Sequence, residues 1–208
     1  SMIPNHFALI GIMKKSKKNV LISVVMAALL VFLDQLTKFL AVVNLKNPGK
    51  VVEIIPNVFE FRYLENQSAA FGIDLLSIIQ RIFKFSYWTN NPEAFLRAKM
   101  IFFSVITLIV VVLLSLWYLR IPQNRKFRAL NILLVIFTAG AIGNLIDRMV
   151  NNYVVDFCYF KLINFPIFNV ADIYVTVAAF FFIILGLFYY KEEDYELIFP
   201  DKNKKKDN

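Results

Sequence analysis

Two aspartates in the last third of the chain have the spacing and the surroundings for acid–base chemistry. Asp156 stands in the apolar run 154–157, and Asp172 follows Phe168-Asn169-Val170-Ala171 at the start of a hydrophobic stretch. Two carboxylates held close together cannot both ionise cheaply, so they share one proton. One can then activate a water as general base while the other acts as general acid toward a carbonyl. Such a pair would permit amide hydrolysis without a nucleophilic side chain, and the spacing does not assign acid and base.

Histidine and cysteine are too scarce for zinc-dependent hydrolysis or for a histidine-activated nucleophile. The 208 residues include one histidine, His6, and one cysteine, Cys158. We interpret Cys158 as a small buried or interfacial residue, with a lipid-modified or reactive thiol as the alternative. A Cys/His zinc site uses about four such ligands, and a Ser-His-Asp or Cys-His nucleophile needs a histidine beside the reacting atoms. Because His6 lies in a polar N-terminal tail, we expect no site of these kinds, no metal and no cofactor.

Membrane helices must position the two aspartates. Hydrophobic residues make up 59% of the chain and charged residues 18%, whereas soluble domains have about 45–50% and about 25%. A spanning helix needs roughly 20 mostly apolar residues, and four segments qualify, at about 20–43, 100–119, 129–149 and 170–190. We therefore predict a single-domain, all-α membrane protein built as a four-transmembrane-helix bundle.

Basic residues in short loops predict the orientation, since they mark the cytoplasmic side. In a four-helix serpentine their three clusters lie on one side, which makes both termini cytoplasmic and puts both aspartates near the outer leaflet. We expect the charged tail 191–208 to be disordered. The clusters are Lys14, Lys15, Lys17 and Lys18; Arg120, Arg125, Lys126 and Arg128; and Lys202, Lys204, Lys205 and Lys206.

The outer segment, about 44–99, has structure of its own. Residues 58–63 alternate apolar and polar, which is the period of a strand. Residues 73–85 have the pattern of a short amphipathic helix lying at the membrane interface. Asn90-Asn91-Pro92 then breaks the chain before the second membrane helix.

Polar residues inside the apolar stretches need a reason, because an ionised side chain there costs at least about 2.5 kcal/mol. Asp34 and Lys38 are four residues apart and can pair, either merely neutralising each other or bracing an active site. Gly140 and Gly143 permit close approach of another backbone, and Asn144 can hydrogen-bond across helices. Asp147 and Arg148 form either an interfacial charge pair or, for the arginine, a binding group for carbonyls or a lipid headgroup.

The order of these motifs resembles the lipoprotein signal peptidase (signal peptidase II) family, from the first helix through the start of the fourth. Two positions depart from that family, which usually has glycine where Ser68 and Asn152 stand; asparagine tolerates the left-handed backbone that a tight turn needs. The stretch 73–97 is also long for the family, and we hypothesise that it forms an extended outer helix or a flap over the site. The motifs are Asp34…Lys38, Asn66…Ala70-Phe71-Gly72, Gly143-Asn144-x-x-Asp147-Arg148, Val155-Asp156-Phe157 and Phe168-Asn169-x-Ala171-Asp172.

The resemblance implies an aspartic endopeptidase with Asp156 and Asp172 as the catalytic pair. The strand at 58–63 would belong to a small extracytoplasmic β-cradle. The residues that would line the site or hold substrate are Asn66, Asn144, Arg148, Asn169, Asp34, Lys38, Gly140 and Ala171.

The same resemblance implies the substrate and the partners. The substrate would be a prolipoprotein with a diacylglyceryl group on its lipobox cysteine, cut just before that cysteine. Globomycin-like cyclic peptides would inhibit the enzyme. It would work as a monomer in the bacterial cytoplasmic (inner) membrane, in contact with membrane lipid and with no nucleic acid.

Two other classes of protein also use intramembrane carboxylates. A small proton-coupled transporter would place them near the midplane on broken helices. A non-catalytic assembly factor would use them as structural ion pairs. Aspartates at one end of the bundle favour chemistry at the interface, and cleavage of a lipidated peptide separates the three.

Overall fold

The computed structural model describes residues 15–47, 50–68 and 75–199. Four of its helices are long and apolar enough to cross a membrane, which confirms the predicted four-helix arrangement. They are α2 (Lys17–Leu45), α5 (Pro92–Arg120), α6 (Arg128–Asn151) and α7 (Val170–Ile184), the last extended by the π-helical turn η3 (Leu185–Tyr189).

Helix α5 starts well before the predicted residue 100. Pro92 occupies its first turn together with Glu93. Proline is suited to that position because its missing N–H has no helical partner there, and an acidic side chain is favourable near the positive end of the helix dipole. The break at Asn91-Pro92 is therefore the helix start, and α5 extends beyond its apolar core.

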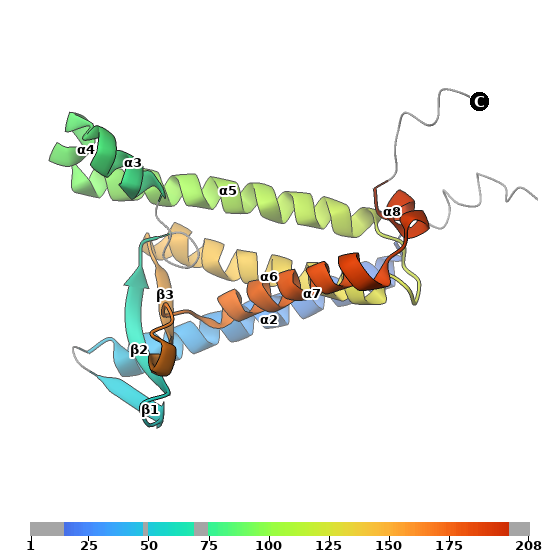
Figure 1. The fold of residues 1–208 in the computed structure, drawn as a ribbon, viewed down its shortest axis with the longest axis horizontal. Coiled ribbons are helices and arrows are strands. Elements are labelled where there is room, and N and C mark those ends of the chain that lie inside the picture. The colour runs from blue at the N-terminus through green and yellow to red at the C-terminus, as the bar shows by residue number, and fades with distance from the viewer. Residues whose placement is uncertain (1–14, 48–49, 69–74, 200–208) are drawn as a thin grey trace, which may run out of the picture.

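Helix α6 is the centre of the bundle and packs against α2, α5 and α7 (Figure 1). Over half of its most apolar window is buried, 56%, against 6% in α2 and in α5. The outer helices expose large apolar side chains such as Leu29, Phe32 and Phe180. Such continuous apolar faces suit lipid as the surrounding solvent.

A three-stranded antiparallel sheet closes one end of the bundle, in the order β1 (Val51–Ile55), β2 (Phe59–Asn66) and β3 (Val154–Phe160) (Figure 1). The strand predicted at 58–63 is confirmed as the first part of β2. Strand β3 joins the C-terminal side of α6 to β2 and pairs Asp156 with Leu64. A further bridge pairs Cys158 with Phe168, just before α7. The sheet thereby brings the segments carrying both aspartates side by side.

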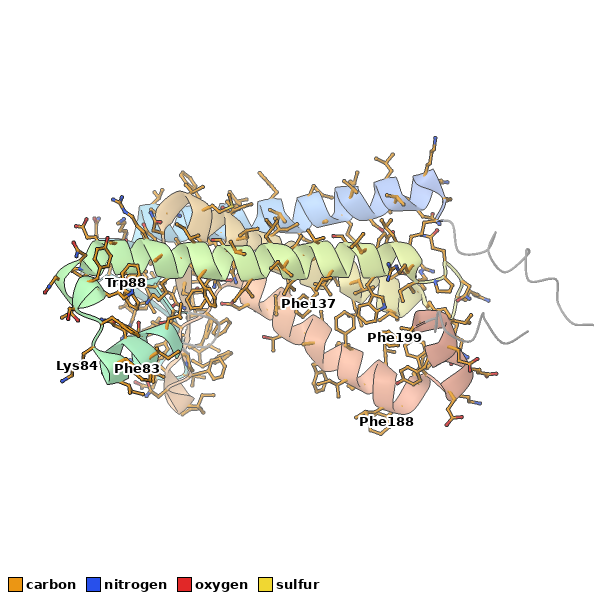
Figure 2. All side chains as sticks on the ribbon, turned by 90° about the horizontal axis from the view of Figure 1, so that it is seen from above. Phe83, Lys84, Trp88, Phe137, Phe188 and Phe199 are labelled. Atoms are coloured by element: carbon orange, nitrogen blue, oxygen red, sulfur yellow. The ribbon has the colours of Figure 1, made fainter. Side chains whose placement is uncertain are left out.

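Short helices complete both ends of the bundle. Near the sheet, α3 (Leu75–Phe83) and α4 (Ser86–Asn90) precede α5, and a one-turn helix, η2 (Lys161–Ile163), follows β3. Figure 2 shows Phe83, Lys84 and Trp88 in this region and Phe188 and Phe199 at the opposite end. Helix α3 lies within the predicted 73–85 segment and exposes Ile82 and Phe83.

The prediction of a disordered tail is wrong for Glu192–Ile198, which form helix α8. Ile198 is buried in the core between the helices, and the carboxylate of Asp194 pairs with Lys126 at 2.5 Å. These two contacts stabilise the helix, although the charged composition of the segment gave no indication of them. Residues 200–208, the early lysine Lys14 and His6 lie outside the described residues.

Candidate active site

Asp156 is buried at the centre of β3, with 1% of its surface exposed. Its Oδ1 accepts a hydrogen bond from Nδ2 of Asn169 at 2.6 Å, and its Oδ2 accepts one from Nδ2 of Asn66 at 2.8 Å. Burial and, after it, the nearby charge of Asp172 together raise the pKa of this carboxyl to about 7, against the lowering effect of the two amide hydrogen bonds. Asp156 is therefore a carboxyl group that exchanges its proton near neutral pH.

Asp172 lies in the first turn of α7 and has a different environment. Asn169 is the N-cap of this helix, where its Oδ1 accepts from the backbone N–H of Asp172 at 3.0 Å. The Asp172 Oδ2 accepts from the backbone N–H of Asn169 at 3.1 Å, which completes a capping box. Asp172 is half-buried and lies at the positive end of the α7 dipole.

Two asparagines join the aspartates in one chain of hydrogen bonds. Nδ2 of Asn169, besides bonding Asp156, donates to Oδ1 of Asn144 at 3.1 Å. Nδ2 of Asn144 in turn donates to Oδ1 of Asp172 at 2.8 Å. Both amides are buried, so each hydrogen bond lies in a medium that strengthens it. The carboxylates are thus held by α6, β3 and the α7 N-terminus together.

Lys38 is the cation that contacts this series of hydrogen bonds, through Asn144. Its Nζ pairs with Asp34 at 2.9 Å and with Asp147 at 3.2 Å, and it donates to Oδ1 of Asn144 at 3.0 Å. All four side chains are buried, so the ammonium uses its three donors on three acceptors. Two carboxylates and one ammonium form a compact cluster between α2 and α6.

The same cluster holds the backbone next to each aspartate of the pair. Oδ1 of Asp34 accepts from the backbone N–H of Ala171 at 2.9 Å. Oδ2 of Asp147 accepts from the backbone N–H of Val155 at 2.9 Å. Ala171 immediately precedes Asp172, and Val155 immediately precedes Asp156. The ion cluster therefore fixes the positions of Asp156 and Asp172 through their neighbours.

Two glycines of α6 allow this close packing. A Cβ on Gly140 would lie 2.6 Å from the backbone oxygen of Ala171, and a Cβ on Gly143 would overlap the carboxylate of Asp34. Real Cβ atoms do not approach other atoms so closely, so both positions need glycine. The expected close approach at these two glycines is therefore present, against α7 and α2 respectively.

Arg148 borders an apolar groove between α5 and α6. The groove has a volume of about 430 Å³, and Met100, Val105 and Leu145 are among its lining residues. Nη1 of Arg148 donates to the backbone oxygen of Asn144 at 3.5 Å, while its buried Nε has no hydrogen-bond partner among the described residues. The guanidinium thus retains donors for a group that enters the groove.

Known proteins are similar to this chain in sequence. The sequence profile of signal peptidase (SPase) II matches residues 26–188, which run from α2 to η3. The chain belongs to the signal peptidase II family. A lipoprotein signal peptidase of Caldanaerobacter subterraneus subsp. tengcongensis is 39% identical over 165 residues, 79% of this chain and 92% of that protein. One of Clostridium tetani is 36% identical over 176 residues, 83% and 95% of the two chains.

A solved structure is similar to this chain in fold. It is described as a bacterial membrane enzyme obtained by the in meso method at 2.3 Å resolution. It aligns with a TM-score of 0.63 at 28% identity and covers 84% of this chain and 91% of that one. The chain is accordingly a membrane peptidase of the signal peptidase II family.

The structure brings together most of the side chains predicted from the sequence. Asn66, Asn144, Asn169, Asp34 and Lys38 connect to the aspartate pair directly or through one neighbour. The part of the signal peptidase II motif at 70–72 lies outside the described residues.

Asp147, Ser68 and Asn152 each have a distinct local environment. Asp147 does not form the interfacial pair with Arg148; it pairs with Lys38, because α2 lies against its face of α6. Ser68 donates its backbone N–H to Oδ1 of Asn66 at 2.8 Å, which directs the other end of that amide toward Asp156. Asn152 has a φ of 60° after α6, the left-handed conformation expected for it.

Gln35 belongs to the site but was not predicted from the sequence. Its Nε2 lies 3.0 Å from Oδ1 of Asp147, 3.1 Å from the backbone oxygen of Gly143 and 3.2 Å from Oδ2 of Asp34. It therefore bridges α2 and α6 beside the ion cluster. The signal that could have indicated it was a polar amide beside Asp34 within an apolar helix.

Proposed function

We propose that the chain removes the signal peptide from prolipoproteins and that Asp156 and Asp172 are its catalytic pair. The observation that carries the proposal is the hydrogen-bonded chain from Asp156 through Asn169 and Asn144 to Asp172. These hydrogen bonds join the buried carboxyl group of Asp156 to the helix-capping carboxylate of Asp172. Named relatives that match most of the chain are lipoprotein signal peptidases.

The two environments support one assignment of acid and base within the proposed pair. Asp156 carries the shared proton, since burial raises its pKa to about 7. Asp172 takes a proton from water, and the water oxygen bonds to the scissile carbonyl carbon while Asp156 gives its proton to the carbonyl oxygen. The resulting gem-diol collapses as the C–N bond breaks. The proton on Asp172 passes to the leaving nitrogen, and Asp156 regains a proton from a diol hydroxyl.

The groove beside Arg148 suits the lipid part of the proposed substrate. Its apolar lining would receive an acyl chain of the diacylglyceryl group, and the arginine would donate to an ester or peptide carbonyl. Binding of the remote chains would then position the peptide bond just before the modified cysteine at the aspartate pair. A globomycin-like cyclic peptide would compete for the same cluster.

The proposed orientation puts the sheet and the aspartate pair on the outer face of the bacterial cytoplasmic (inner) membrane, with both termini cytoplasmic and the protein a monomer. Positive loop charges at the opposite end support this orientation.

Helix α3 would lie at the interface with Ile82 and Phe83 toward lipid. Nζ of Lys99 donates to Ser77 Oγ at 3.3 Å, which attaches α3 to α5. The proposed flap function of 73–97 is tested by deleting α3 and α4. Unchanged turnover and unchanged substrate preference in the deletion variant would refute a flap function.

No feature of the described residues favours the transporter alternative. Asp156 lies on a strand at the end of the bundle and Asp172 at the first turn of a helix, whereas a carrier would have them near the middle of broken helices.

The lipid requirement is the test of the proposed substrate. The purified chain in detergent would be given two lipobox peptides that differ only in the diacylglyceryl group, with products identified by mass spectrometry. We expect cleavage just before the cysteine of the lipidated peptide alone. Equal cleavage of both peptides, or of neither, would refute the substrate assignment.

A further inference from the structure

A polar cavity lies at the end of the bundle opposite the aspartate pair. It has a volume of about 670 Å³ and lies between α2, α6 and the loop that joins α5 to α6. Arg125 and Arg128 line it at the loop, and Ile22, Met26 and Ile132 line it further along the two helices. The cavity is therefore charged at its rim and apolar toward the middle of the bundle.

The two arginines have no counter-charge among the residues that the structure describes. The backbone N–H of Arg128 donates to the Arg125 oxygen at 3.4 Å, so both side chains leave the same turn. Both side chains are exposed, no carboxylate is among the lining residues, and neither guanidinium forms an ion pair with the described part of the chain. The nearby carboxylate of Asp194 pairs with Lys126 instead.

A third cation is fixed against the cavity wall. Nζ of Lys15 lies 3.3 Å from the centre of the Tyr118 ring and donates a hydrogen bond to Oδ1 of Asn131. Asn131 is itself held, because its Nδ2 donates to the backbone oxygens of Pro122 and Phe127 at 3.0 Å. Burial lowers the pKa of Lys15 to about 8, so an anion placed nearby would stabilise its charged form.

We propose that this cavity is a binding site for one anionic phospholipid. The phosphate would lie between Arg125 and Arg128, within reach of Lys15, and an acyl chain would follow Ile22, Met26 and Ile132. Basic pockets between membrane helices suit anionic headgroups, and guanidinium groups bind phosphate with two parallel hydrogen bonds. The apolar wall distinguishes a lipid from a soluble anion. The site is separate from the aspartate pair and does not depend on the proposed peptidase chemistry.

The test compares lipid binding by the purified full chain in neutral detergent. Phosphatidylglycerol and phosphatidylcholine would be titrated, with bound lipid counted by native mass spectrometry and the unfolding midpoint followed. We expect phosphatidylglycerol to bind and raise the midpoint, and Arg125→Gln/Arg128→Gln to weaken its affinity about tenfold or more. The matched control Lys18→Gln/Arg120→Gln removes the same charge from exposed positions at the same end. We expect this control to bind like the wild type.

A second pair of variants tests the apolar wall. Ile22→Trp would obstruct the cavity, whereas Leu21→Trp changes the neighbouring position, which does not line it; the two residues are 54% and 63% exposed. We expect only the first to weaken phosphatidylglycerol binding. The proposal fails if the Arg125/Arg128 variant binds like the wild type, if the Lys18/Arg120 control loses as much, or if inorganic phosphate stabilises the chain equally well.

Discussion

The side-chain amide of Asn169 donates a 2.6 Å hydrogen bond to Asp156, and the same residue caps the helix that carries the second aspartate. One asparagine thus joins the strand bearing one carboxylate to the helix bearing the other. The separation of the two carboxylates is set by this short link as well as by helix packing. Its two functions, capping and bridging, can be separated by substitution.

Asn169→Ser is expected to keep the cap and lose the bridge. A serine hydroxyl can accept from the backbone N–H of Asp172, as good N-cap residues do, but is too short to reach Asp156. We expect near-normal thermal stability and at least about a tenfold loss in kcat, since misplaced catalytic groups are costly. Asn169→Ala should lose the cap too, at about 0.5–2 kcal/mol of stability. Full peptidase activity in the serine variant would contradict the bridging role.

Lys38→Met should destabilise the fold because it leaves Asp34 and Asp147 buried without their cation. Removing one partner of a buried ion cluster costs about 3–5 kcal/mol. The measurement is the unfolding midpoint in detergent. Lys46→Met is the matched control, since Lys46 pairs with Glu65 at 3.1 Å on the surface and should matter little. Equal shifts for the two methionine variants would argue against the central position of Lys38.

Gly143→Ala should damage the site through a single methyl group. The new Cβ would overlap the Asp34 carboxylate, which must move and release the backbone N–H of Ala171. Overpacking of this kind costs about 1–3 kcal/mol, and we expect activity to fall with it. In Gly186→Ala the methyl would meet only the Tyr195 hydroxyl at 3.4 Å, so this variant should stay active. A fully active Gly143→Ala enzyme would show that the contact with Asp34 does not matter.

The pH profile of cleavage should have an alkaline limb near pH 7, where Asp156 loses its proton. Asn66 donates to the ionised form and so lowers this pKa; Asn66→Ala should therefore move the limb to higher pH. The raised pKa of Asp156 also predicts how its contribution to folding stability changes with pH. The contribution of Asp156 is present below its unfolded pKa of about 4 and is lost as the pH rises through about 7. A limb that stays in place in Asn66→Ala would contradict this assignment.

The sequence predicted the parts of the site that depend on local pattern. Four long apolar runs can only be helices in lipid, because each backbone polar group must be satisfied within its own segment. The positions of Asp156 and Asp172 beside apolar residues marked them as unusual. Asn152 followed from the tolerance of asparagine for the left-handed backbone.

Contacts between distant segments were beyond that reasoning. Strand β3 has no alternation because the side chains from Val154 to Cys158 are all buried, so only its pairing with β2 reveals it. The sequence indicated one partner for Lys38, the carboxylate of Asp34 four residues away. Its second carboxylate partner, Asp147, is placed beside it by the packing of α6 against α2. Helix α8 depends on the burial of Ile198 and on Lys126, neither of which its charged composition indicates.

The most direct measurement is cleavage of a diacylglyceryl-cysteine lipobox peptide by the wild type and by Asp156→Asn and Asp172→Asn, each first shown to be folded by its unfolding midpoint. We expect the wild type to cut before the cysteine and each variant to lose nearly all activity, since neither acid nor base can be replaced by a neutral amide. Full activity in either folded variant, or an inert wild type on several lipidated peptides, would contradict the aspartate pair as the catalytic centre.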